Sequence, residues 1–165
     1  MSDSAVSSLL ARARDAIEAG DEAAAMTAWE EAEAISNLVG VSVKDRITLP
    51  IPSADALSWS LWGAASGNTS AMFTAACAYR DGVGTRRNRM QSVRWYLTML
   101  GHRDGHGIHE AHQVVKRGMT DAEILQAGVL AGQQHAAQAL ISTLPANSRR
   151  GRHWRPAWWR NAQSQ

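Results

Sequence analysis

An internal repeat constrains the fold of this chain more than any other feature of its sequence. When the sequence is shifted by 36 residues, segment 57–83 falls on 93–119 with apolar and small residues in register. The spacing of these matches is helical, and a fixed period of this length is typical of stacked helical hairpins. The repeat therefore predicts an all-α solenoid. The matching pairs are Leu57 with Val93, Trp59 with Trp95, Leu61 with Leu97, Ala64 with Leu100, Ala71 with Gly107, Met72 with Ile108, Ala75 with Ala111, Tyr79 with Val115, Gly82 with Gly118, and Val83 with Met119.

Each unit is expected to hold two helices joined by a short turn. A glycine near the end of the first helix can adopt left-handed dihedral angles, and a small residue early in the second lets the helices cross closely. A third, shorter copy begins at Thr120, whose Thr-Asp-Ala-Glu sequence is a capping box. The first helices are expected at 54–66, 89–100 and 121–131, ending near Gly67, Gly101 and Gly132; the second helices are expected at 69–81, 107–117 and 134–144, with Ala71, Gly107 and Ala136 near their starts.

The N-terminal segment 1–38 predicts one more helical hairpin. Two apolar stripes with helical spacing are separated by Gly20-Asp21, and Asp21 can cap the second helix. Segment 39–52 alternates apolar and polar residues, which permits a short β-hairpin, but Pro50 and Pro52 favour an extended linker. The expected fold is a right-handed α–α superhelix of about four hairpins. Its parts are the hairpin 1–38, the linker 39–52, the repeats 53–145 and a basic tail 146–165.

The best-preserved stretch resembles a known repeat. It consists of Tyr79-Arg-Asp-Gly82-Val83-Gly84, then Ser92-Val-Arg-Trp95-Tyr96, and then Gly101-His102. An aromatic residue, a Gly-x-Gly turn, a Trp-Tyr helix and a Gly-His turn resemble the Sel1-like repeat, a member of the tetratricopeptide-like solenoids. The resemblance covers 54–118 best and continues more weakly to 144. It implies a protein-interaction scaffold with a concave groove and no enzymatic activity.

Charge is distributed unevenly along the chain. The formal net charge is only +2, yet residues 1–36 hold eight acidic and two basic residues, whereas the rest holds seven acidic and fifteen basic residues. Arginine outnumbers lysine fifteen to two. Arginine binds carboxylates and phosphates through two parallel hydrogen bonds, although a GC-rich genome also favours its codons. A dipolar molecule of this kind can steer an acidic partner to its basic part.

Two groups of residues in the repeats are candidates for partner binding. Trp62 and Tyr96 are aromatic candidates for the groove, whereas Trp59 and Trp95 are assigned to the core between helices. The loop between units carries Arg86, Arg87 and Arg89, with Arg94 one turn further on. These arginines can grip an acidic protein or a phosphate backbone, or they form a solvated loop.

The C-terminal tail alternates arginine and tryptophan. Such a mixture can bind a partner protein, nucleic acid or an anionic membrane surface, or the tryptophans can cap the last repeat. The residues concerned are Arg149, Arg150, Arg152, Trp154, Arg155, Trp158, Trp159 and Arg160.

Histidines and the single cysteine give weaker indications. His106, His109 and His112 have spacing that can hold zinc or nickel, but the repeat aligns the latter two with Phe73 and Ala76, which are structural positions. Cys77 is interpreted as a small hydrophobic residue of the core. No metal and no cofactor are therefore expected.

The sequence contains no motif typical of catalysis. It has no phosphate-binding loop and no nucleophile–base signature, and it shows neither a signal peptide nor a membrane span, so a cytoplasmic protein is expected. We expect a non-catalytic adaptor that binds a protein or peptide of acidic character in a solenoid groove. The alternative is a nucleic-acid-binding accessory protein that uses the loop arginines and the tail. The partner's identity and the oligomeric state are not encoded in these patterns.

Overall fold

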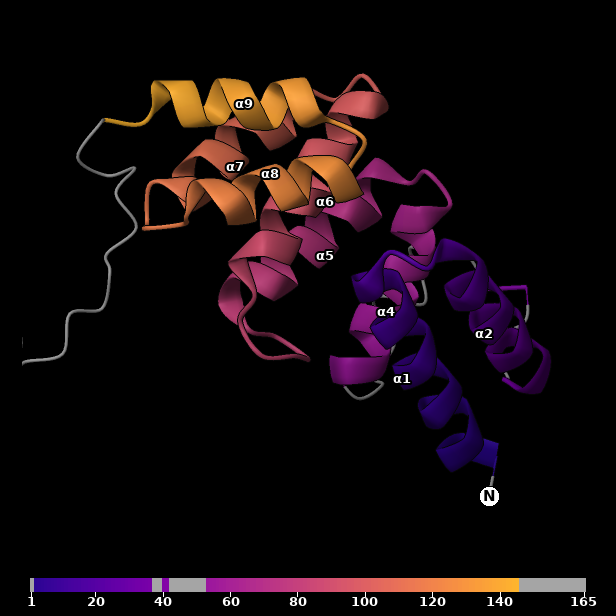
Figure 1. Ribbon diagram of the computed structural model, residues 1–165. Coiled ribbons are helices and arrows are strands. Elements are labelled where there is room, and N and C mark those ends of the chain that lie inside the picture. The colour runs from indigo at the N-terminus through magenta and orange to yellow at the C-terminus, as the bar shows by residue number, and fades with distance from the viewer. Residues whose placement is uncertain (1, 37–39, 42–52, 146–165) are drawn as a thin grey trace, which may run out of the picture.

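The computed structural model describes residues 2–36, 40–41 and 53–145. Over these ranges the chain forms eight α-helices and no strand, which confirms the all-helical prediction. The linker 39–52 lies almost entirely outside the described residues, as does the tail 146–165. The helices, drawn in Figure 1, are α1 (Ser2–Ala19), α2 (Glu22–Ile35), α4 (Ser53–Ala65), α5 (Thr69–Asp81), α6 (Arg89–Gly101), α7 (His106–Val115), α8 (Asp121–Leu130) and α9 (Gln134–Thr143).

The helices pair in chain order into four hairpins. α1 packs on α2, α4 on α5, α6 on α7 and α8 on α9, because short turns hold each pair together. Neighbouring hairpins are joined by α1 against α4, α5 against α6, and α6 against α8. Figure 1 shows α1 and α2 at one end of the molecule, α8 and α9 at the other, and α6 between them. Because α6 has neighbours on several sides, most of its side chains are buried.

The 36-residue repeat recurs in the structure. Both ends of α4 and α6 differ by that interval, and Trp59 and Trp95 are 1% and 3% exposed. The backbone repeats too: Gly67 and Arg103 have φ of 91° and 61°, and Gly82 and Gly118 have φ of 79° and 98°. The matching apolar residues are therefore the core, and the glycines lie in the turns. The last hairpin, α8–α9, keeps the two helices but not the 36-residue interval.

The turn after α6 differs from the prediction. Gly101 is the last residue of α6, and Arg103 adopts the left-handed conformation instead. The backbone N–H of Arg103 bonds to Leu100 O and that of Asp104 to Met99 O, so the turn closes two residues later than predicted. A side chain in this conformation costs about 1 kcal/mol relative to glycine. Gly67 and Gly132 have the positive φ that was predicted.

The predicted helix starts are largely confirmed. Asp21 accepts a hydrogen bond from Ala24 N at 3.0 Å, and Asn88 accepts one from Gln91 N at 3.1 Å. Both hydrogen bonds of the Thr120–Glu123 capping box are present. These side chains satisfy N–H groups that a helix start leaves unbonded.

Two glycines allow helices to approach closely. A Cβ on Gly107 would lie 2.2 Å from Tyr96 O, and one on Gly128 would lie 2.5 Å from Ala137 Cβ. The first contact joins α7 to α6 and the second joins α8 to α9. Gly107 therefore has the role that the sequence predicted for a small residue near the start of a second helix.

Polar contacts attach α1 to α4, α5 and α6. Ser58 of α4 donates to Leu10 O at 2.7 Å and accepts from Trp29 Nε1 at 3.0 Å. Gln91 of α6 donates to Glu18 O at 2.9 Å. The Tyr79 hydroxyl of α5 donates to Glu18 Oε1 at 2.6 Å. The acidic hairpin is thus part of the same packed body as the repeats.

Candidate partner-binding surface

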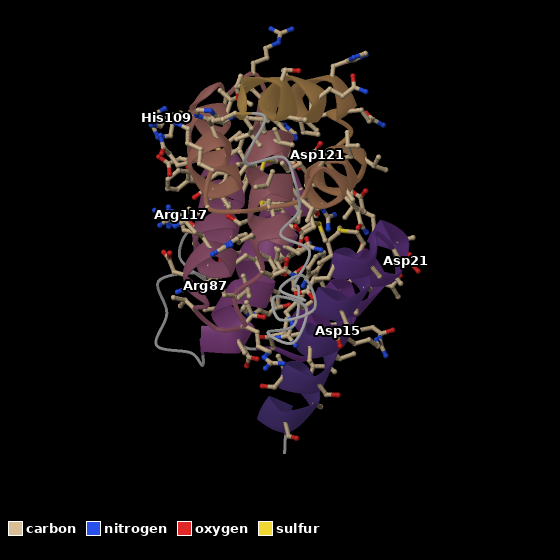
Figure 2. The ribbon with its side chains drawn as sticks, turned by 60° about the vertical axis from the view of Figure 1, so that its left-hand side comes forward. Asp15, Asp21, Arg87, His109, Arg117 and Asp121 are labelled. Carbon is tan, nitrogen blue, oxygen red and sulfur yellow. The ribbon has the colours of Figure 1, made fainter. Side chains whose placement is uncertain are left out.

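Four arginines meet where α5 ends, α6 begins and α7 ends. We name Arg80, Arg87, Arg89 and Arg117 the arginine cluster; with Asp81 and Val114 they line a small pocket of about 70 Å³. Figure 2 shows Arg87 and Arg117 on one side of the molecule, with Asp15 and Asp21 of the acidic hairpin on the other. The separation of charge along the sequence is therefore also a separation in space.

Local backbone structure brings the cluster together. Helix α5 ends at Gly82, whose positive φ turns the chain, and Asn88 N then bonds back to Tyr79 O at 2.9 Å. The loop between them therefore stays against the end of α5 and carries Arg87. Arg89 Nη1 donates to Arg117 O at 2.9 Å, which joins the start of α6 to the end of α7.

Among the described residues, one acidic residue lines this pocket, and a second, Glu110, accepts from Arg80 Nη1 at 3.4 Å. Arg80 donates to both oxygens of Asp81, from Nε to Oδ1 at 2.9 Å and from Nη2 to Oδ2 at 2.8 Å. That hydrogen bonding lowers the pKa of Asp81, and the positive charges of Arg87 and Arg117 lower it further. Within the described part of the chain, Arg87 and Arg117 have no carboxylate at ion-pair distance. The pocket therefore has excess positive charge.

Contrary to the prediction from its spacing, Arg94 does not lie with the exposed loop arginines but is buried on another face of α6. Arg94 is only 6% exposed, and its Nη1 donates to Ile17 O and to Gln91 Oε1. Its guanidinium carbon also lies 4.7 Å from the centroid of the Trp95 ring. Arg94 follows Arg89 by five residues, which is a rotation of about 140° around a helix, so the two side chains leave α6 on different faces. Arg86 is exposed, as the prediction requires.

The two aromatic candidates have different surroundings. Trp62 is half-buried, with its ring centroid 5.4 Å from that of Trp59. Tyr96 is fully buried, and its hydroxyl lies 3.3 Å from Cys77 Sγ and 3.3 Å from Arg80 Nη1. Tyr96 therefore supports Arg80 from inside and is not exposed to a partner. The assignment of Trp59 and Trp95 to the core is confirmed.

The histidines do not converge. Among the described residues, no three His, Cys, Asp or Glu side chains form a group that could hold a metal ion. The His106 ring instead lies 5.8 Å from that of Phe73, centroid to centroid. The pKa of His112 is lowered, chiefly by burial and then by the charges of Lys116 and His109. Cys77 is half-buried, so it is less enclosed than predicted.

The tail candidates, from Arg149 to Arg160, lie outside the described residues. The sequence analysis also missed two members of the arginine cluster, Arg80 and Arg117. The 36-residue shift contains a clue to both, because it aligns Arg80-Asp81 with Lys116-Arg117. Equivalent positions of adjacent units lie near one another in stacked hairpins, so charged residues at the ends of both second helices can form one surface.

The fold and the cluster together define an all-helical protein of packed hairpins with a localised basic surface. No protein-family model matches the chain, and neither a curated protein nor a solved structure shows significant similarity to it. Among the described helices, none has both the length and the apolar character needed to cross a membrane.

Proposed function

We propose that this protein is a non-catalytic interaction scaffold that binds an acidic segment of a partner protein at the arginine cluster. The observation that carries the proposal is the convergence of four arginines, from three helix termini and a loop, on a pocket in which Asp81 is the one described acidic residue. Arg80 alone of the four also pairs with Glu110. Arginine presents a planar set of donors that matches carboxylates, and arginines are frequent among residues that dominate binding energy.

The proposal includes the type of repeat. We propose that the hairpins form a right-handed superhelix of Sel1-like units. Its support is the repetition of helix bounds, buried residues and turn conformations at 36 residues, which extends over α4–α5 and α6–α7. In such an array the ends of successive second helices lie side by side, which accounts for the joint contribution of α5 and α7 to one surface.

The distribution of charge favours an acidic polypeptide over nucleic acid. Residues 53–145 carry eight Arg and Lys against six Asp and Glu, and residues 1–36 carry a large excess of acid. A long phosphate backbone would meet repulsion from the acidic hairpin, whereas a short acidic segment needs only the arginine cluster. Complementary charge would also accelerate and orient the encounter.

The experiment uses a short fluorescent peptide of alternating glutamate and glycine, a glutamine counterpart, and a single-stranded DNA oligonucleotide. Fluorescence anisotropy is measured with the full chain and with the double variant Arg87→Glu/Arg117→Glu. Arg103→Glu is the control, because Arg103 is also exposed but lies at the turn between α6 and α7. We expect the double variant to bind the glutamate peptide at least about tenfold more weakly, with no change for the control.

Two results would contradict the proposal. Equal losses in the double variant and the control would show only non-specific attraction. Tight binding of the oligonucleotide, with a steep salt dependence that requires Arg87 and Arg117, would instead support the nucleic-acid alternative.

A further inference from the structure

The turns of the four hairpins lie along one side of the molecule, at the same end of each hairpin. A Cβ on Gly20, in the α1–α2 turn, would lie 3.0 Å from Leu130 Cδ2 of α8. A Cβ on Gly67 would lie 3.3 Å from His102 Cε1, and one on Gly101 would lie 3.2 Å from Gln133 Nε2. Each turn is therefore in contact with another, and the first hairpin touches the last.

A hollow of about 270 Å³ lies at this end and receives residues from all four hairpins. It is separate from the arginine cluster, with which it shares no lining residue. Its apolar wall includes Ile17, Ala64, Ala65 and Leu130, and its polar groups include those of Arg94 and Trp95. The exposed surface of the hollow is more polar than apolar, because Glu22, Arg94, Thr98 and His102 also line it. Its volume is near the lower end of the range of small-ligand sites, in which a few convergent polar groups orient the ligand.

Arg94 brings a positive charge into the hollow without a partner of opposite charge. Its Nη1 has two acceptors, Ile17 O and Gln91 Oε1, and both are neutral. The buried Nε has no hydrogen-bond acceptor, and no ion pair involves Arg94 within the part of the chain that the structure describes. Burial lowers the pKa of this side chain, and the charges of Glu22 and Glu18, which lie beyond ion-pair distance, oppose that shift. A buried charge without a directly paired counter-charge is unfavourable, so its presence here needs a reason.

Trp95 adds a second unsatisfied donor. The residue is 3% exposed, lines the same hollow, and its Nε1 is buried without an acceptor. Buried N–H groups are nearly always hydrogen-bonded in folded proteins. Two adjacent residues of α6 thus offer positive charge and N–H groups beside an apolar wall.

We propose that this hollow binds a carboxylate that carries a small branched apolar group, either a free organic acid or the C-terminal residue of a peptide. The carboxylate would lie beside Arg94 and Trp95 and supply the missing negative charge. The apolar group would pack on Ala65 and Leu130. The site requires a shift of side chains by the ligand, because Arg94 Nε and Trp95 Nε1 are covered in the present arrangement.

Other charged and titratable side chains around the hollow determine how ligand affinity should depend on the charge of the ligand. Glu22 and His102 also line it, and both are exposed. Glu22 would repel a carboxylate, so its removal should strengthen binding. The direction of this change distinguishes a carboxylate ligand from a cation, because Glu22 would attract a cation and its removal would weaken binding.

The test uses the full chain and four probes: 3-methylbutanoate, its amide, N-acetylleucine and N-acetylleucinamide. Binding is measured by isothermal titration calorimetry and by ligand-observed NMR. We expect at least one acid to bind about tenfold or more tightly than its amide. Preference for 3-methylbutanoate identifies a free acid as the natural type of ligand, and preference for N-acetylleucine identifies a peptide C-terminus.

Three variants locate the binding. Arg94→Met should weaken binding of the preferred acid by about tenfold or more, since it removes the charge. Ala65→Leu should do the same by filling the hollow while leaving the bonds of Arg94 in place, so it keeps the test valid if Arg94→Met does not fold. Glu22→Gln should strengthen binding severalfold. The proposal is overturned if acids and amides bind equally or not at all, if Ala65→Leu binds like the unaltered chain, or if Glu22→Gln abolishes binding.

Discussion

Helices α4 and α6 use equivalent repeat positions to hold α1, but with different chemistry. Ser58 and Arg94 are 36 residues apart, and each donates to a carbonyl of α1, Leu10 O and Ile17 O respectively. The positions three residues earlier, Asp55 and Gln91, also bond to α1. Ser58 has both a donor and an acceptor partner, whereas Arg94 retains an unsatisfied Nε and an unpaired charge. The hydrogen bonds between helices therefore account for the Ser58 hydroxyl. At the equivalent position, Arg94 has a donor and a charge that these hydrogen bonds do not satisfy.

The largest effect on stability is expected at residue 107, a second position at which the two repeat units differ. Its counterpart in the first unit is Ala71, which has a Cβ, whereas a Cβ on Gly107 would meet Tyr96 O at 2.2 Å. Gly107→Ala should therefore lower the free energy of unfolding by about 2–3 kcal/mol, because α7 must move away from α6. Urea denaturation followed by circular dichroism measures the change. A loss below 0.5 kcal/mol, roughly the size of a surface substitution, would show that the helices are not in close contact.

Truncation of the two α1-binding side chains should have unequal effects. Ser58→Ala leaves Trp29 Nε1 without a partner in the core and removes one of the bonds to Leu10 O, so it should cost about 2 kcal/mol. Arg94→Met removes one bond to Ile17 O, which keeps its bond from Gly20 N, and it also removes a buried charge that has no ion pair, so its cost should be below about 1 kcal/mol. Thermal unfolding of both variants tests the order. A larger loss for Arg94→Met would mean that Arg94 is needed mainly for stability.

The two tyrosines should make the fold sensitive to alkali. Burial raises the pKa of Tyr79, and its hydrogen bond to Glu18 raises it further; burial also raises the pKa of Tyr96. The unfolded chain loses these protons near pH 10 while the folded chain keeps them, so stability should fall as pH rises above about 10. Tyr79→Phe should reduce the slope of unfolding free energy against pH between about pH 9 and about pH 11. An unchanged slope would contradict the assignment to Tyr79.

The smallest effect is expected at Asp81, which the repeat aligns with Arg117. Asp81→Asn removes the only carboxylate of the arginine-cluster pocket and should strengthen binding of the glutamate peptide severalfold. The effect on stability should be small, because the side chain of Asp81 is 49% exposed and its ion pair with Arg80 is screened. Anisotropy titrations at low and high salt measure the gain, which salt should diminish. Weaker binding by this variant would indicate that Asp81 contacts the partner itself.

The sequence predicted the parts of the fold that depend on local pattern. Periodicity located the core at Trp59 and Trp95, and capping chemistry located the starts of α2, α6 and α8. The environment of Arg94 could not be predicted, because the atom that binds it, Ile17 O, is 77 residues away in the sequence. Tyr96 was misplaced for a similar reason: its face of α6 is covered by residues of α5 and by the close approach of α7 at Gly107.

The candidate surface was predicted in part. Arg86, Arg87 and Arg89 are exposed, as their loop position suggested. Arg80 and Arg117 could not be assigned to this surface from local sequence, because 37 residues separate them and only the packing of α5 beside α6 and of α6 beside α7 brings them together. Alignment of the two units by their 36-residue period, followed by comparison of the charged positions, indicates both Arg80 and Arg117.

The hydrogen bonds of α1 also bear on cooperativity. In a linear array each unit contacts only its neighbours, so unfolding can begin at one end and proceed unit by unit. Here α1 bonds to α4 and to α6, and the α1–α2 turn touches α8. Loss of the first hairpin would therefore remove contacts from every other hairpin at once. A chain connected in this way should unfold in a single cooperative transition. Detachment of the acidic hairpin should destabilise all the other hairpins together.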